Sequence, residues 1–388
     1  MLSVRSGLPL AVLAASFAAH GGMAQTTTVV SGGGPALANA VQAAQPGDTL
    51  IVRAARYDPI VVTRGIRILC DPGVVVRPAS PGSVVSVDVR GVPTGQELVI
   101  HGMSLPGQGF AFPPPTPYVL SVTGCAGRVV LQRLSFTEAQ WNYNAYATIA
   151  DCGDLSLNDC LLSQVLVARS TISLASCTTN RPTNALPPRG TLSVSNSSVF
   201  VNGGSIFGGQ SSISFFEAYP GIHATASTLT LAGAARVAGG TFGQVFAPAI
   251  EADASTRIHL GPKTSITAGV TPPIRGGVTL AEPLPGVSVR NAVAGGVATF
   301  TTTGQPGTLV ASLLSWNAAP FPLPFGTLWI DTAAPVFDLG PMPSSGDRSV
   351  TTPVPPPLAR ESLTAQAIAL GTTPNDLFVG APTRFVVQ

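Results

Sequence analysis

A short strand motif, in which two apolar residues flank one other residue, recurs along most of the 388-residue chain. Each copy places two apolar side chains on one face of a strand, and a polar turn usually follows. The eight copies start at Ile66, Leu98, Val129, Leu155, Leu192, Leu229, Ile258 and Val287. Another apolar residue usually comes seven or eight positions after the start, which indicates a second strand that bends back to the same core. Copies spaced 26 to 37 residues apart predict a β-solenoid, in which each turn buries its apolar face only against its neighbours.

Polar residues recur directly after these strands. They are Gln132, Asn158 and Ser195, three positions after a start, and Asp159, Asn196 and Asn291, four positions after a start. Asn and Asp suit tight turns. Their side chains can also hydrogen-bond up and down a stack of turns, so the pattern favours a structural role for them over catalysis.

The composition agrees with this architecture. Only 10% of the residues are charged, where about a quarter is typical, and the chain holds 42 Gly and 36 Pro. Long helices and coiled coils are excluded because they need charged, Gly-poor sequence. A nucleic-acid partner is excluded because the net charge is only +2 and Lys263 is the single lysine. The ratio of 19 Arg to one Lys is typical of a GC-rich bacterial gene.

A capping helix is predicted at the N-terminal end of the solenoid, over residues 35–44. Leu37, Ala40, Val41 and Ala44 recur at helical spacing, and Pro35 suits a first helical turn. The following Pro-Gly-Asp segment ends the helix. Such a helix would cover the apolar core and the strand edges that an open solenoid end exposes.

The segment LANAVQAAQPGDTLIVRAARY, residues 37–57, followed by the repeated turns, resembles the opening of right-handed parallel β-helix proteins of the pectin-lyase-like superfamily. The resemblance implies an all-β fold, a right-handed parallel β-helix over residues 28–290. It implies little about activity, because this fold carries lyases, hydrolases, esterases, adhesins and inert passengers.

The two ends of the chain differ from the repeat. Residues 1–25 read as a secretory signal peptide, with Arg5 before a short apolar run and small residues before a cleavage point, so we expect a secreted or cell-surface protein without a transmembrane segment. Residues 291–388 predict a small antiparallel β-sandwich-like module. Its expected strands are 297–302, 309–316, 327–331, 336–339, 363–370 and 384–387, and Pro353–Pro357 is expected to form an extended loop. This module could cap the open solenoid end, attach the protein to a surface or serve an export system.

Four carboxylates are the candidates for catalysis, namely Glu138, Asp151, Asp154 and Asp159. Neighbouring turns could bring two of them to the spacing of about 6.5 to 9.5 Å that inverting glycoside hydrolysis needs. Ordinary turn chemistry accounts for Asp154 and Asp159 equally well. The acidic clusters of pectin-degrading hydrolases have no counterpart in the sequence, and the spacing after Arg181 and Pro182 does not fit the arginine segment of the lyases.

Aromatic residues give a candidate binding surface. Trp141, Tyr143 and Tyr146 lie in a polar stretch between two strands, where their rings could stack against sugar rings. The alternative is that these rings pack beneath their own loops.

The five cysteines all lie in the first half of the chain, and no Cys/His spacing fits a zinc site. Cys125 and Cys152 precede strands of adjacent turns at nearly the same position, so a disulfide between them is sterically possible. Cys160 is expected to be a buried core thiol. We expect neither a metal nor a cofactor.

These patterns favour a monomeric, exported, non-catalytic β-helix protein that presents a rigid surface for binding or attachment, with polysaccharide or cell-surface glycan as the partner. A divergent polysaccharide lyase or glycoside hydrolase is the alternative. Carboxylates that converge in one groove would favour the enzyme, and scattered carboxylates would favour the binding protein.

Overall fold

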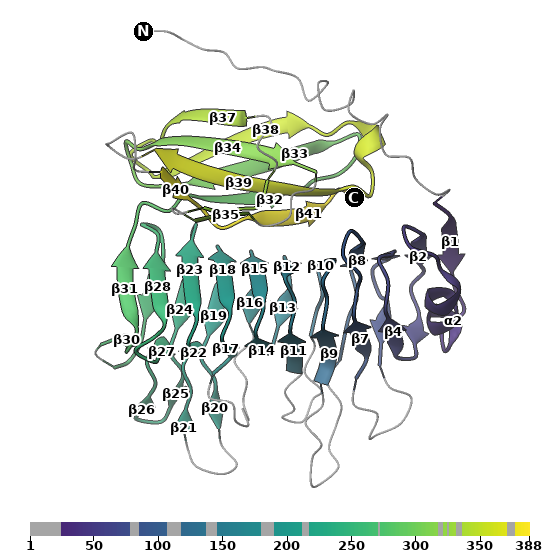
Figure 1. The fold of residues 1–388 in the computed structure, drawn as a ribbon, viewed down its shortest axis with the longest axis horizontal. Coiled ribbons are helices and arrows are strands. Elements are labelled where there is room, and N and C mark those ends of the chain that lie inside the picture. The colour runs from purple at the N-terminus through teal and green to yellow at the C-terminus, as the bar shows by residue number, and fades with distance from the viewer. Residues whose placement is uncertain are drawn as a thin grey trace.

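The computed structural model describes residues 25–77, 85–106, 118–136, 146–179, 190–211, 217–270, 272–316, 321–323, 326–330, 336–370 and 377–388. The predicted signal peptide, apart from Gln25, lies outside these ranges. The all-β fold is confirmed: a parallel β-solenoid carries a capping helix at its N-terminal end and an antiparallel module that follows it in the chain (Figure 1).

Each coil of the solenoid contributes strands to parallel sheets, which we call A, B and C. Sheet A contains β1 (Thr27–Val30), β2 (Thr49–Val52), β5 (Arg67–Cys70), β8 (Glu97–His101), β10 (Arg128–Gln132), β12 (Asp154–Asn158), β15 (Thr171–Ala175), β18 (Ser198–Asn202), β23 (Thr228–Ala232), β28 (Arg257–Leu260) and β31 (Val278–Ala281). Sheet C contains β4 (Ile60–Val62), β7 (Val87–Arg90), β9 (Tyr118–Thr123), β11 (Tyr146–Ala150), β14 (Gln164–Ala168), β17 (Leu192–Ser195), β22 (Ile222–Thr225), β27 (Ile250–Ala252) and β30 (Ile274–Arg275). Sheet B contains β13 (Leu161–Leu162), β16 (Thr178–Thr179), β19 (Ser205–Phe207), β24 (Arg236–Ala238) and β29 (Ser265–Thr267), and β3 (Arg56–Tyr57) pairs with β6 (Val75–Val76).

Apolar side chains stack in register along the interior. Leu131, Leu157 and Leu174 follow one another across β10, β12 and β15, and all three are buried. The alternation within each strand sends the residues between them to the outer face. The predicted pairs of inward-facing residues therefore form the core, which runs without a break from the helix to Ile258.

Two of the predicted repeat positions were wrong. Leu192 lies in sheet C rather than sheet A, and the sheet A strands on either side of it contain Ile172 and Val199. Ile172 follows Leu155, its neighbour in the stack, by only 17 residues because this coil has no long excursion. Val287 belongs to an antiparallel strand of the C-terminal module. The same alternation marks strands of every sheet, so periodicity alone cannot assign a strand to its sheet.

The turns between the sheets depend on left-handed backbone. Asp159, Asn196 and Asn291 have φ values of 53°, 49° and 56°, as their residue types predict. Asp151 and Arg169 adopt the same conformation at the turn from sheet C to sheet A. One residue in this conformation turns the chain sharply, so side chains just before and after it project at the corner.

The predicted capping helix is confirmed as α2 (Ala36–Ala43), with Pro35 at its N-cap. Leu37 and Val41 are buried against the first coils, while the remaining face is more exposed. At the other end of the solenoid the last sheet A strand, β31, is exposed along its whole length. No helix in the described part of the chain has the length and apolar character needed to cross a bilayer.

The C-terminal module consists of antiparallel strands around its own core. They are β32 (Gly286–Arg290), β33 (Val297–Thr303), β34 (Leu309–Ser315), β35 (Phe321–Leu323), β36 (Gly326–Leu328), β37 (Val336–Pro341), β38 (Asp347–Pro353), β39 (Ser362–Leu370), β40 (Leu377–Val379) and β41 (Thr383–Val386). The sequence did not predict β35, β38 or β40, and it assigned the strand of β32 to the solenoid. The proline run contains a short 3-10 helix, Pro356–Leu358. The module does not cap the open end. It lies along the side of the solenoid, opposite the hairpins β20 (Gln210–Ser211)–β21 (Glu217–Ala218) and β25 (Thr241–Phe242)–β26 (Val245–Phe246) (Figure 1).

Candidate functional site

The C-terminal module covers the outer face of the middle strands of sheet A. Strand β41 packs across β10, β12 and β15, so outward-facing residues there are buried although they point away from the solenoid interior. Ser156 and Ser173 are each only 1% exposed for this reason. Val386 packs on Val99 and Val130 in a small apolar cluster between the two parts. This face is therefore an intramolecular interface and not a free surface.

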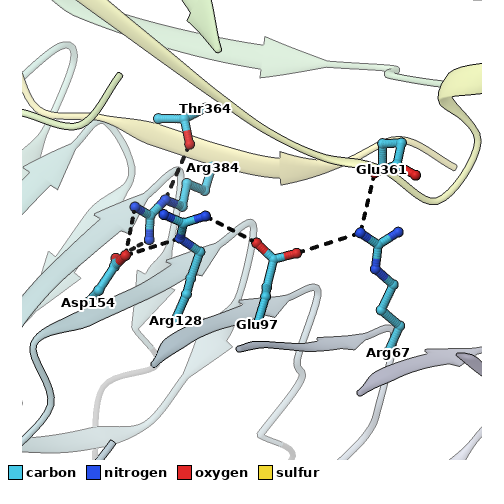
Figure 2. A network of polar contacts seen from close by, with 7 residues as sticks. All are labelled: Arg67, Glu97, Arg128, Asp154, Glu361, Thr364 and Arg384. Carbon is cyan, nitrogen blue, oxygen red and sulfur yellow. Dashed lines mark hydrogen bonds and ion pairs between the residues drawn. The ribbon is translucent and has the colours of Figure 1, made fainter. Parts of the chain in front are cut away.

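A row of alternating charges lies in this interface (Figure 2). Glu97, Arg128 and Asp154 are neighbours in register on β8, β10 and β12. Arg128 Nε lies 3.0 Å from Asp154 Oδ2, and its Nη1 lies 3.5 Å from Glu97 Oε2. Arg67 extends the row, because its Nη2 lies 3.8 Å from Glu97 and 3.3 Å from Glu361 of the module. Burial raises the pKa of Glu97 in spite of the surrounding guanidinium groups.

Arg384 of β41 inserts into this row from the module side (Figure 2). Its guanidinium pairs with both carboxylate oxygens of Asp154 and donates from Nε to the Thr364 hydroxyl at 3.2 Å. It also lies over the ring of Trp329, 4.8 Å from the ring centroid. Arg384 is only 1% exposed, and desolvation lowers its pKa while Asp154 opposes that shift. The buried carboxylate of Asp154 thus pairs with two arginines, Arg128 and Arg384.

Amide side chains at the ends of sheet A strands bind the module, a role that the sequence did not reveal. Gln132 Oε1 accepts a 2.6 Å hydrogen bond from the backbone N–H of Val386. Asn202 Nδ2 donates to the carbonyl of Val287 at 2.6 Å and to the Thr383 hydroxyl at 2.7 Å. These bonds run across the interface, whereas the sequence had suggested bonds along the stack. Whether these amides bond across the interface or along the stack depends on where the strands of the module lie. Those strands are distant from the amides in the chain.

A groove lies beside this interface, at the corner where sheet C turns into sheet A. It has a volume of about 590 Å³ and is open to solvent. Its lining consists of Asp151, Cys152, Gly153, Arg169, Ser170, Thr171, Asn196, Ser197, Ser198, Ala226 and Thr228. These residues come from the same position in four successive coils. With coils stacked at about 4.8 Å, the groove follows the solenoid axis for roughly 14 Å.

The charged part of the groove is an ion pair between neighbouring coils. Arg169 Nε and Nη2 donate to the two carboxylate oxygens of Asp151 at 2.6 and 2.8 Å. This bidentate contact lowers the pKa of Asp151, so the carboxylate is ionised near neutral pH. Asn196 and Ala226 take the equivalent corner positions in the next two coils. The groove thus presents a charged half and a neutral polar half.

Serine hydroxyl groups at the same corner position of successive coils form a hydrogen-bonded ladder along the groove, which we call the serine ladder. Ser170, Ser197 and Ser227 each follow the left-handed corner residue, and each hydroxyl donates to the carbonyl two residues earlier. The backbone N–H of Ser170 donates to Ser197 Oγ at 3.0 Å, and that of Ser197 donates to Ser227 Oγ at 3.2 Å. Each coil is thereby fixed to the next, which holds the groove lining in a rigid geometry.

The three described candidate acids do not converge. Asp151 lies in the groove, Asp154 is buried beneath the module, and Asp159 lies at the far end of β12. Asp159 pairs with Arg133 of the preceding coil, 3.0 Å from its Nε. Asp154 and Asp159 are five residues apart on one strand, which separates them by roughly 16 Å. Among the described residues, Asp151 is the only carboxylate that lines the groove.

The predicted aromatic platform cannot be followed as a whole, because Glu138, Trp141 and Tyr143 lie outside the described residues. Tyr146 is described, and it is only 3% exposed at the start of β11. It therefore offers no free ring face to a ligand, which corrects the expectation for this residue.

All five cysteines are buried free thiols, as predicted for Cys160. Cys125 and Cys152 lie in hydrogen-bonding contact at the corner above the serine ladder. Within the described ranges, no three or more His, Cys, Asp or Glu side chains are placed to hold a metal ion. With one ion pair, the amide of Asn196 and several hydroxyl groups, the groove is equipped to bind a polar ligand by hydrogen bonds.

His101, at the end of β8, leads to a prediction of how the stability of the protein depends on pH. Desolvation, with Arg133 nearby, lowers its pKa to about 4, while Asp159 opposes the shift. An unfolded histidine has a pKa of about 6.5, so the unfolded chain binds more protons between pH 4 and 6.5. Stability should therefore fall as the pH is lowered through this window.

Urea unfolding between pH 4 and 8 measures this effect. His101→Gln should be as stable to urea as the unaltered protein at pH 8. Below pH 6.5 its stability should decline less than that of the unaltered protein. An identical decline in the variant would show that other groups cause it.

Comparison of the sequence with models of known protein families gives no match, and comparison with curated proteins gives none either.

Proposed function

We propose that this chain is an exported, non-catalytic β-helix protein of the pectin-lyase-like type that binds an extended polar polymer, with a polysaccharide as the favoured ligand. The observation that carries the proposal is the groove along four coils. Its Ser and Thr hydroxyl groups recur at the coil spacing, which suits a ligand that is itself a linear repeat. Sugar hydroxyls both donate and accept hydrogen bonds, as do the Ser, Thr and Asn side chains that line the groove.

The carboxylate arrangement supports binding over hydrolysis. Acid–base cleavage of a glycosidic bond needs two carboxyl groups on opposite sides of that bond. In the groove Asp151 is engaged by Arg169 and has no acidic partner within the part of the chain that the structure describes. A polysaccharide lyase or glycoside hydrolase remains the second candidate, with Asp151 and Glu138 as the residues to test.

Retention of the protein on immobilised pectic, alginate and neutral glycans tests the proposal. Thr228→Trp places a large side chain in the groove and should weaken retention at least about tenfold on the ligand that binds. Thr148→Trp is the matched control, because Thr148 faces outward on sheet C, away from the groove, and it should bind normally.

Four outcomes would contradict the proposal. Absence of retention on every glycan would remove the polysaccharide ligand, and equal retention of both Trp variants would remove the groove. Turnover of a glycan that is lost in Asp151→Asn would identify an enzyme. Loss of retention in Trp141→Ala alone would move the binding surface to the predicted aromatic stretch.

A further inference from the structure

Four of the five cysteines are stacked two by two in the solenoid. Cys125 and Cys152 each follow the left-handed residue that ends a strand of sheet C, namely Gly124 and Asp151. The backbone N–H of Gly153 donates to the carbonyl of Cys125 at 3.2 Å, which places the two cysteines directly above one another. Both are 1% exposed.

Cys160 and Cys177 repeat this arrangement at the next corner. They follow the left-handed residues Asp159 and Ser176, which end neighbouring strands of sheet A. The backbone N–H of Thr178 donates to the carbonyl of Cys160 at 2.9 Å, which stacks the second cysteine on the first. The pair is buried in the solenoid core.

Stacking of this kind brings the Cα atoms within the range that a disulfide spans. Residues in register on adjacent parallel strands are about 4.8 Å apart, and disulfides join Cα atoms about 4.4 to 6.8 Å apart. Cys152 and Cys160 cannot pair with each other, because β12 separates them. Cys70 is left without a stacked partner among the other four cysteines, which occupy two complete pairs.

We propose that two disulfide bonds, Cys125–Cys152 and Cys160–Cys177, join three successive coils of the solenoid, and that Cys70 remains a thiol. Each bond forms when two thiols lose two protons and two electrons. The electrons reduce one disulfide of an oxidant, such as oxidised glutathione, to two thiols.

The two bonds would hold the coil of β12 from both sides. One fixes its first corner to the coil of β10, and the other fixes its second corner to the coil of β15. This coil carries both Asp151 of the groove and Asp154 of the module interface. The bonds would therefore stiffen the part of the solenoid on which both features depend.

The electrostatics favour reaction at the first pair. A hydrogen bond from Cys152 lowers the pKa of Cys125 to about 7, so a thiolate is available near neutral pH. Because the folded pairs are buried, the oxidant must reach them before the coils are fully packed. Oxidation is therefore expected during folding rather than afterwards.

The serine ladder supplies a control substitution for the first pair. Ser170 and Ser197 occupy the same corner position in the next two coils. Cys125→Ser/Cys152→Ser should therefore continue the ladder and fold normally. Cys160→Ala/Cys177→Ala is the corresponding variant for the second pair.

The test is refolding of the protein with and without oxidised glutathione, followed by alkylation in denaturant, intact mass and peptide mapping. We expect a mass loss of about 4 Da, one alkylated cysteine at Cys70, and linked peptides for the two proposed pairs. Each double variant should lose one bond and keep the other.

Thermal unfolding gives a second readout. Oxidation should raise the Tm by at least about 5 °C, and each double variant should lose part of this rise. Five alkylated cysteines after oxidative refolding, or a bond that includes Cys70, would overturn the proposal. The outcome does not depend on glycan binding, so it can fail or succeed independently of the proposed function.

Discussion

Arg384→Met is expected to lower the free energy of unfolding by about 3 kcal/mol or more. Removal of one partner from a buried ion pair leaves the other charge desolvated, and Asp154 is only 8% exposed. Arg128 still pairs with Asp154 in the variant, so we expect the lower end of the range for such substitutions. The contact of the guanidinium with the Trp329 ring is lost as well.

Urea unfolding followed by circular dichroism measures the loss, and limited proteolysis reports whether the module separates from the solenoid. Arg53→Met is the control, because Arg53 pairs with Asp71 at 3.0 Å while both side chains are largely exposed. Its substitution should leave unfolding nearly unchanged. Arg384→Met/Asp154→Asn should recover part of the stability, since no unpaired carboxylate remains. Equal stability of Arg384→Met and the unaltered protein would contradict a docking role for Arg384.

Gly204→Ala is expected to lower the free energy of unfolding by at least about 4 kcal/mol or to prevent folding. Gly204 follows β18 with a φ of 78°, and a Cβ there would lie 2.1 Å from the carbonyl oxygen of Cys177. That oxygen belongs to the stacked coil below, and it accepts the hydrogen bond that holds Ser205 in sheet B. The clash therefore cannot be relieved by a side-chain rotation, and two coils must separate.

Gly203→Ala provides the matched control one residue earlier. Gly203 also has a positive φ, 67°, but a Cβ there meets no atom within 4 Å. In this variant the free energy of unfolding should fall only by the cost of placing alanine in left-handed backbone, about 1 to 2 kcal/mol. Soluble yield and thermal unfolding distinguish the two. Similar losses of stability in both variants would show that the positive φ, and not the close approach of the Cys177 carbonyl, is what disfavours a side chain at Gly204.

The local features of the fold could be predicted because they depend on short segments. The helix at residues 35–44, the inward-facing apolar pairs and the left-handed turns at Asp159 and Asn196 all follow from residue type and spacing. Six expected strands of the C-terminal module have counterparts at nearly the same positions. Assignment of strands to sheets failed at Leu192, because strands of sheets A and C carry the same alternation.

The candidate site was predicted less well. Asp151 was selected from the sequence and lies in the groove, but its partner Arg169 was not, although both occupy equivalent corner positions in successive coils. Asp154 was selected as an acid, and the structure makes it the anchor for Arg384. The two residues are 230 positions apart, and no spacing rule connects them.

The sequence by itself determined that the chain coils, because repeated apolar pairs can be buried only by stacking one turn on another. It also determined where the turns lie, because few residue types accept left-handed backbone. Only the tertiary structure decided which face the C-terminal module covers. That choice depends on whether Gln132, Asn202 and Asp154 meet complementary groups on β32 and β41, and such complementarity exists only once both parts have folded.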